Sequence, residues 1–227
     1  MKVNIINPGN ITRKAAKKEA EKICRLLNSE FPSISSTQIS EFNTTKSTPK
    51  FQLFAQNIEK RIINFVREPS WKDFMKFGDD KFYITFVDKI KKYKVANCSD
   101  RSKLYYLLAK INGLNSQKAE MILATSDGKL GSAIDHAIQI FPINGQEIKF
   151  GKLSKMKDVL IIDPWLGFAE FAPKYEQRIK TDYHQFFQIS DDQSVLLNPY
   201  VHCEPKVSTN VIEYFKKHFP QININAK

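Results

Sequence analysis

Residues 97–113 read NCSDRSKLYYLLAKING and predict a helix with a cysteine at its start. Apolar residues recur at i, i+3, i+4 and i+7, which places them on one face of an α-helix: Leu104, Leu107, Leu108 and Ile111. Asn97 and Asp100 suit a helix N-terminus, and Asn112-Gly113 suits a helix end. We therefore expect Cys98 at or just before the first turn, where backbone N–H groups and the positive end of the helix dipole favour a thiolate.

Strands are expected after this helix. Residues 119–124 predict one strand and residues 134–143 a second, with a turn at Asp127-Gly128 between them. Asn144-Gly145 is typical of a hairpin turn and predicts a third strand near residues 148–150. A helix followed by a small antiparallel sheet is the expected arrangement.

His136 lies at the start of the second expected strand. Side chains alternate between the two faces of a strand, so His136 shares a face with Ile138 and Ile140. If that face packs on the helix of Cys98, the imidazole points toward the helix start.

A carboxylate follows the next apolar run. Val159–Ile162 predicts a buried strand, and Pro164 favours an extended conformation for Asp163. Covalent acyl transfer by a thiol requires a nucleophile, a base and an orienting carboxylate. We expect Cys98, His136 and Asp163 to supply them, with Asp163 accepting from the Nδ1–H of His136.

Each of these residues has a structural alternative. Cys98 is otherwise a small buried residue, His136 a hydrogen-bonded core histidine, and Asp163 a carboxylate in a turn. Asp135 competes as the partner of His136, but adjacent strand residues face opposite ways. Cys24, within an amphipathic helix, is interpreted as a packed core thiol.

The chain is interpreted as a single domain of residues 1–227. Residues 1–50 are expected to hold a helix and a loop rich in Ser and Thr, and residues 80–170 the catalytic core. Helical periodicity marks further segments: 11–30, 52–67, 71–77, 80–94 and 211–219. Pro69 is expected to stop the 52–67 helix, and Gly78 to end the next one.

The composition favours acidic partners. The net charge is +11, which suits nucleic acid, an anionic membrane surface or an acidic protein, although a generally Lys-rich surface is the favoured explanation. Lys89–Lys94 is interpreted as the solvated face of a helix, without a specific nucleic-acid signature. No apolar run approaches the roughly 18 residues of a membrane span, and we expect no secretory signal. Three widely spaced cysteines favour a reducing compartment.

Metal and nucleotide chemistry are not expected. His202-Cys203 lies away from any CxxC or HxxxH pattern, and the chain has no glycine-rich phosphate motif. The sequence therefore predicts a site without a metal or an organic cofactor.

The order and contexts of these residues resemble the transglutaminase-like superfamily of papain-like thiol enzymes. In that family a Cys opens a helix, and the His and Asp lie on neighbouring strands of the sheet behind it. The matching segments are Asn97-Cys98-Ser99-Asp100, His136-Ala137 and Ile162-Asp163-Pro164-Trp165. Many members carry Trp where this chain has Ile138. Three side chains are candidates for an upstream oxyanion donor: Gln52, Gln56 and Asn57.

The resemblance implies an α+β fold in which the helix with Cys98 packs on a small antiparallel sheet with His136 and Asp163, behind additional N-terminal helices. It implies a protease, deamidase or transglutaminase that acts on a protein amide through an acyl-enzyme. The alternative is an inactive thiol-enzyme fold that binds a protein partner through its basic surface. Trp165 is a candidate for the wall of the substrate groove, or else a core residue.

The basic character and the N-terminal helical region are similar to secreted effectors of intracellular bacterial pathogens. This similarity implies a role in virulence and a host protein as substrate. We expect the chain to be cytoplasmic, or to be delivered by a non-Sec route into a host cytosol.

Overall fold

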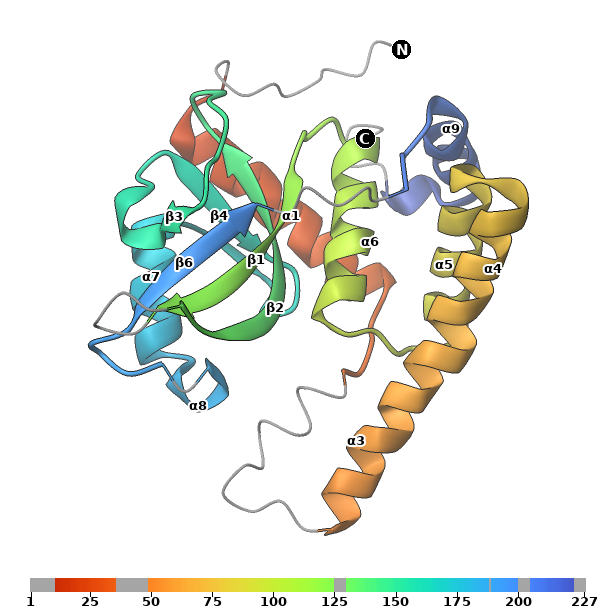
Figure 1. The fold of residues 1–227 in the computed structure, drawn as a ribbon. Helices are drawn as coiled ribbons and strands as arrows, with labels where there is room; N and C mark the ends of the chain where they lie inside the picture. Colours follow the sequence, from red (N-terminus) through yellow and green to blue (C-terminus); the bar gives the residue numbers. More distant parts are fainter. Residues whose placement is uncertain (1–10, 36–48, 125–129, 188, 200–204, 223–227) are drawn as a thin grey trace.

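The computed structural model describes residues 11–35, 49–124, 130–187, 189–199 and 205–222, and its architecture is α+β (Figure 1). The helices are α1 (Arg13–Glu30), α3 (Pro49–Arg61), α4 (Glu68–Phe77), α5 (Asp79–Tyr93), α6 (Cys98–Ile111), α7 (Ala172–Thr181), α8 (His184–Phe187) and α9 (Thr209–His218). A π-helical segment (Ile62–Arg67) joins α3 to α4, and short 3-10 turns cover Leu153–Lys155 and Pro220–Ile222. The strands are β1 (Gln117–Ala124), β2 (Leu130–Pro142), β3 (Gly151–Lys152), β4 (Val159–Asp163), β5 (Phe168–Phe171) and β6 (Ser194–Pro199).

The strands form one antiparallel sheet in the order β3-β6-β1-β2-β4-β5. Met121 of β1 pairs with His136 of β2, but the next residue, Ile122, pairs with Ala133, so the register shifts beside His136. An irregularity of this kind bends a strand and redirects the side chains next to it. The shift therefore lies where the orientation of His136 is set.

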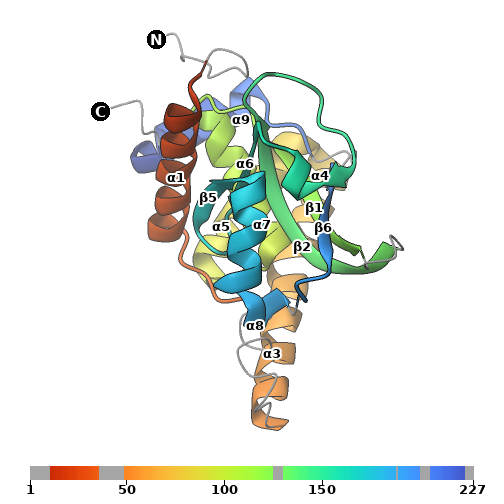
Figure 2. The same cartoon turned by 90° about the vertical axis from the view of Figure 1, so that its left-hand side faces the viewer.

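Two hydrophobic clusters cover the two faces of the sheet. Leu160 and Ile162 of β4 pack with α1, α5, α6 and α9. Ile161, between them, points to the other face and packs with Tyr175 of α7. Figure 2 shows α7 in front of the sheet and α6 behind it. Helices from both ends of the described chain, α1 and α9, therefore share one cluster.

We considered that the face of β2 that carries His136 packs on α6, but in the structure the opposite face does. The Gln139 amide donates to the Ser102 hydroxyl of α6 at 2.9 Å, so Gln139 faces α6. His136 and Ile138 alternate with Gln139, and Ile138 packs in the cluster of α7. Cys98 still meets this face, because it begins α6 and packs against the same cluster.

The sequence correctly predicts the start of α6. Asn97 has an extended backbone and caps the helix, and its N–H donates to the Asp100 carboxylate at 3.1 Å. This reciprocal capping box fixes Cys98 as the first helical residue. The helices expected over residues 11–30, 80–94 and 211–219 are confirmed as α1, α5 and α9.

Pro69 does not stop the helix before it. The chain continues through Pro69 into α4, because the preceding segment adopts π-helical turns and the Glu68 N–H bonds to the Ile63 carbonyl. Wider turns relieve the clash that a proline ring causes in an α-helix. Gly78 ends α4 as expected, with φ at 84°.

The third strand was also predicted incorrectly. Residues 148–150 are not a strand, and Gly151–Lys152 pairs with β6 rather than with β2. β6 comes from residues 194–199, so this pairing depends on a distant segment that a local pattern does not show.

Part of the expected loop after α1 has a defined position. Ile34 forms a parallel bridge with Val95, and the Ser35 hydroxyl donates to Asn97 at 3.0 Å. The rest of that loop and the turn at Asp127-Gly128 lie outside the described residues. In the part of the chain that the structure describes, every helix is too short or too polar to traverse a lipid bilayer.

Candidate active site

His136 and Asp163 form a buried pair on neighbouring strands. β2 and β4 pair antiparallel, which brings the two side chains together on the α7 face of the sheet. The distance from His136 Nε2 to Asp163 Oδ2 is 2.7 Å, and the residues are 4% and 0% exposed. Asp163 therefore binds Nε2, and the expected contact with Nδ1 is wrong.

Cys98 approaches the same imidazole from the first residue of α6. Its side chain is partly exposed, and its interaction with the imidazole raises the pKa of His136. Because Nε2 is bound to Asp163, only Nδ1 is left among the ring nitrogens to exchange a proton with the thiol. The structure thus brings Cys98, His136 and Asp163 together in a connected series, which we call the triad.

The triad holds a positive imidazole beside a negative carboxylate. Burial opposes a charge on His136, but the charge and hydrogen bond of Asp163 outweigh it, and the pKa of the imidazole rises to about 10. The neighbouring Cys98 also raises the pKa of the imidazole. Burial likewise opposes the charge on Asp163, but His136 and other hydrogen-bond donors hold the pKa of this carboxyl below its usual value. At neutral pH the pair is an imidazolium and a carboxylate.

The Asp163 carboxylate accepts hydrogen bonds on both oxygens. Oδ1 accepts from the backbone N–H groups of Trp165 (3.0 Å) and Leu166 (2.9 Å). Oδ2 accepts from His136 and from the Tyr175 hydroxyl, which lies at 2.6 Å. The turn after β4 fixes one oxygen, and side chains from β2 and α7 fix the other.

Aromatic side chains enclose the imidazole on the α7 side. The rings of Trp165 and Phe187 lie edge-on to His136, with centroids 5.3 and 5.2 Å away. Trp165 is 5% exposed, so its ring is buried against the imidazole. The two rings keep water from the His136–Asp163 hydrogen bond, and a hydrogen bond shielded from water is stronger. A role for Trp165 in a substrate groove stays a prediction.

Arg101 ties α6 to the turn that follows Asp163. It is buried, and its Nε donates to the Pro164 carbonyl at 2.9 Å. The same guanidinium donates to the Ser33 hydroxyl at 2.8 Å and to the side-chain amide oxygen of Asn28. Burial lowers the pKa of Arg101 to about 10, which leaves it charged at neutral pH. The guanidinium therefore fixes the position of α6 relative to the carboxylate.

A second ion pair holds the first turn of α6. Arg67, in the π-helical segment, donates two hydrogen bonds to the buried Asp100 carboxylate, at 3.0 and 2.9 Å. The Asn97 amide donates to Glu59 of α3 at 2.6 Å. The helical arm of α3 and α4 thus contacts the residues on either side of Cys98.

Sequence reasoning missed Tyr175, Arg101 and Arg67. Tyr175 follows β4 by a turn, a short strand and the start of a helix, and that helix was not predicted. Arg101 lies one turn after Cys98 and three residues before Leu104, on the apolar face of α6, and a charge at that spacing was the available signal. The expected core of residues 80–170 contains neither Tyr175 nor β6.

Other predicted residues lie as follows. Cys24 is confirmed as a core thiol, 1% exposed, and burial raises its pKa. The oxyanion candidates Gln52, Gln56 and Asn57 are exposed on α3. The side chain of Asp135 and the pair His202-Cys203 lie outside the described residues. Within the described ranges, no three His, Cys, Asp or Glu side chains gather as a metal ion would require.

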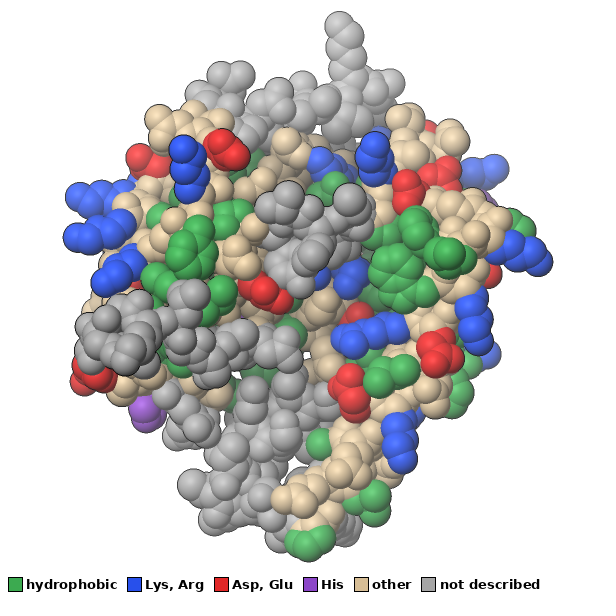
Figure 3. Space-filling view, in the orientation of Figure 1, with side chains coloured by type: hydrophobic (Ala, Val, Ile, Leu, Met, Phe, Trp, Pro, Cys, Tyr) green, Lys and Arg blue, Asp and Glu red, His purple; other side chains and the backbone are tan. Residues whose placement is uncertain are grey.

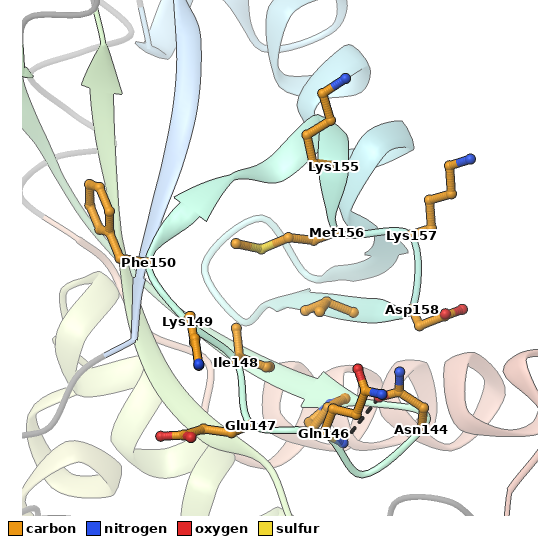
Figure 4. A pocket seen from close by; sticks show the side chains of 12 residues that line it. Asn144, Gln146, Glu147, Ile148, Lys149, Phe150, Lys155, Met156, Lys157 and Asp158 are labelled. Atoms are coloured by element: carbon orange, nitrogen blue, oxygen red, sulfur yellow. Dashed lines mark hydrogen bonds between the residues drawn. The ribbon is translucent and has the colours of Figure 1, made fainter.

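A separate cavity of about 490 Å³ lies between the loop after β2 and the start of β4 (Figure 4). Ile148 and Met156 point into it, whereas Lys155 and Lys157 point away. The cavity includes no residue of the triad, and its lysines do not converge on a common point.

Charged side chains are spread over the visible surface. Figure 3 shows Lys and Arg side chains distributed over that face with Asp and Glu among them. The positive charge therefore does not gather into one patch on the face in view.

Comparisons with known proteins give no relative. No protein-family model, no curated protein and no solved structure matches the chain. The functional conclusion therefore rests on the geometry of the site.

Proposed function

We propose that the chain is a thiol enzyme that acts on a protein amide through an acyl-enzyme. Cys98 is the nucleophile, His136 the acid and base, and Asp163 the orienting carboxylate. One observation carries the proposal: a partly exposed thiol at a helix start interacts with an imidazole that is itself 2.7 Å from a buried carboxylate. Such a series activates a sulfur nucleophile and supplies a proton to a leaving group.

The first half of the reaction forms a thioester. The Cys98 sulfur bonds to the amide carbon while the carbonyl electron pair moves to oxygen. The N-terminal turn of α6, with its backbone N–H groups and dipole, favours that oxyanion. The His136 imidazolium then gives its proton to the amide nitrogen, the C–N bond breaks, and the amine leaves.

The second half releases the acyl group. Water or an amine attacks the thioester carbon, His136 takes the proton of the attacking group, and the C–S bond breaks to return the Cys98 sulfur. Water as acceptor gives proteolysis or deamidation of a Gln side chain, and an amine gives transamidation. Asp163 keeps the imidazole in one orientation throughout, and the steps require no metal or organic cofactor.

The described fold is α+β, and we propose that it is a papain/transglutaminase-like arrangement. The support is the placement of Cys98 at the start of α6 and of His136 and Asp163 on paired strands. The proposed setting is cytoplasmic, or a host cytosol entered by a bacterial effector. It rests on the sequence resemblance.

The test is detection of the acyl-enzyme and its products. Wild type and Cys98→Ala are incubated with casein and a primary amine, and three products are followed: new peptides, released ammonia and incorporated amine. We expect at least one product with wild type, a thioester adduct on Cys98 by intact-mass spectrometry after an acid quench, and neither with Cys98→Ala. Full activity in Cys98→Ala would contradict the proposal.

A binding module is the second candidate, and the arm of α3 and α4 favours it. Large apolar side chains are exposed along this arm: Leu53, Phe54, Ile63, Phe65, Trp71, Met75 and Phe77. Exposed apolar surface of this extent is typical of interaction sites. If binding is the function, Cys98→Ala retains the partner, Phe54→Glu loses it, and the thiol shows ordinary reactivity.

A further inference from the structure

Tyr175 and His136 donate to the same oxygen of Asp163. The Tyr175 hydroxyl lies 2.6 Å from Oδ2, and His136 Nε2 lies 2.7 Å from it. Tyr175 comes from α7, which lies on the opposite face of the sheet from α6 (Figure 2), and its side chain is fully buried. Either donor alone could hydrogen-bond to a carboxylate at the end of a strand. The convergence of both donors on one oxygen is therefore a specific arrangement.

We propose that Tyr175 is a positioning residue of the triad, which fixes the Asp163 carboxylate and limits the strength with which it holds the His136 proton. The inference rests on the proposed function, since His136 must release that charge to a leaving amine. It adds a fourth side chain to the three that the sequence predicts.

The carboxylate has no rotational freedom while all of its donors are in place. Backbone N–H groups of Trp165 and Leu166 hold Oδ1, so rotation about the carboxyl carbon would break bonds to both oxygens. Two donors on Oδ2 also divide its negative charge, and a shared acceptor attracts each proton less than an unshared one. Without the Tyr175 hydroxyl, Oδ2 would accept a hydrogen bond from His136 alone and would hold its proton more strongly.

The Tyr175 hydroxyl stays a donor over the range in which His136 works. Burial and the neighbouring Asp163 charge raise the pKa of the phenol well above its usual value. Other ionisable groups act on Asp163 or Tyr175 from surrounding elements: His136 on β2, Arg101 on α6, Cys24 on α1, and Tyr183 after α7. Cys98 on α6 acts on His136. Tyr175→Phe leaves all of them in place, so a comparison with wild type isolates the hydroxyl.

The experiment is an NMR titration of the His136 ring in wild type and in Tyr175→Phe. The His136 signal is assigned from its loss in His136→Gln. In Tyr175→Phe we expect the pKa of His136 to rise by about half a unit to one unit, because the unshared oxygen holds the proton more strongly.

Tyr83→Phe is the matched control. Tyr83 is equally buried, and its hydroxyl donates to the Pro205 carbonyl at 2.8 Å, away from the triad. A role in stability alone would lower the melting temperature in both variants and leave the His136 titration unchanged in both. A folded Tyr175→Phe with an unchanged His136 titration overturns the inference.

A second measurement, made on wild type, tests the inference even if the Tyr175→Phe variant does not fold. In wild type, the Tyr175 hydroxyl proton and the His136 Nε2 proton point at one oxygen, so their labile signals should show a mutual cross-peak. Observation of the Nε2 proton without that cross-peak also overturns the inference. Both readouts are independent of thiol reactivity, so an unreactive Cys98 would refute the proposed function and leave the role of Tyr175 to be judged separately.

Discussion

The Arg101 guanidinium donates to the Pro164 carbonyl at 2.9 Å and thereby joins the helix that begins at Cys98 to the residue that follows Asp163. Arg101 lies one turn after Cys98, and Pro164 lies directly after Asp163. Contacts with Ser33 and Asn28 bring the end of α1 and the segment after it into the same assembly. The distance between thiol and carboxylate thus depends on a cation outside the triad.

Arg101→Met should destabilise the protein and slow the reaction of its thiol. The substitution leaves buried acceptors without a donor, and we expect the free energy of unfolding to fall by about 2–4 kcal/mol. Urea denaturation measures this loss, and alkylation of Cys98 measures the effect on the site. Arg25→Met, exposed on α1, is the control and should change the free energy by less than about 0.5 kcal/mol. Equal effects from the two substitutions would contradict a role for Arg101.

Gly167→Ala should disturb the same assembly from the turn after β4. Gly167 has φ at 80°, and an added Cβ would lie 2.9 Å from the Asn28 amide nitrogen, which belongs to a partner of Arg101. We expect a loss of about 1–3 kcal/mol and slower Cys98 alkylation. Gly78→Ala is the comparison, since Gly78 has φ at 84° but open space around its Cβ position. It should lose stability without slowing alkylation, and slowing by both variants would indicate a general effect of instability.

Arg67→Met should weaken the start of α6. Asp100 is 1% exposed, and removal of its bidentate partner leaves a buried carboxylate uncompensated, which costs about 3–5 kcal/mol. The double variant with Asp100→Asn should recover part of that loss, because the unpaired charge is then gone. Denaturation of the two single variants and the double variant gives the coupling energy. Strictly additive losses would show that the pair does not act as a unit.

The stability contributed by the His136–Asp163 pair should vary with pH. The pKa of folded His136 is about 10 against an ordinary 6.5, so its contribution is complete below about pH 6.5 and is lost as pH rises toward 10. The pKa of Asp163 is lowered from 3.8, so its contribution is present above that value and is lost as pH falls through the folded pKa. His136→Gln should therefore cost most stability between about pH 4 and 6.5. Urea denaturation at pH 5, 7 and 9 measures this cost, and one that grows toward pH 9 would contradict the charged pair.

The sequence predicts the helix that begins at Cys98 well, because its signals are local. Apolar spacing, the capping residues around Cys98 and the stop at Asn112-Gly113 all lie within one segment. The placement of Asp163 at a strand end is likewise a local property of Val159–Ile162. These elements suffice to suggest the three site residues.

The remaining parts depend on distant pairings. β6 enters the sheet between β3 and β1, and Tyr175 reaches Asp163 only once α7 packs on the sheet. The ring nitrogen of His136 that meets Asp163 depends on the approach of both neighbours, so alternation along β2 does not decide it. The local rule that a proline ends a helix fails at Pro69, because π-helical turns precede it.

The most direct test of the triad is the rate of iodoacetamide alkylation at each cysteine as a function of pH, read by mass spectrometry in wild type and His136→Ala. Cys24 is an internal control, because it is buried and burial raises its pKa. We predict fast, selective labelling of Cys98 near neutral pH, slowed roughly tenfold or more by His136→Ala. Slow labelling of Cys98 with the pH dependence of an ordinary thiol, unchanged by His136→Ala, would contradict the triad.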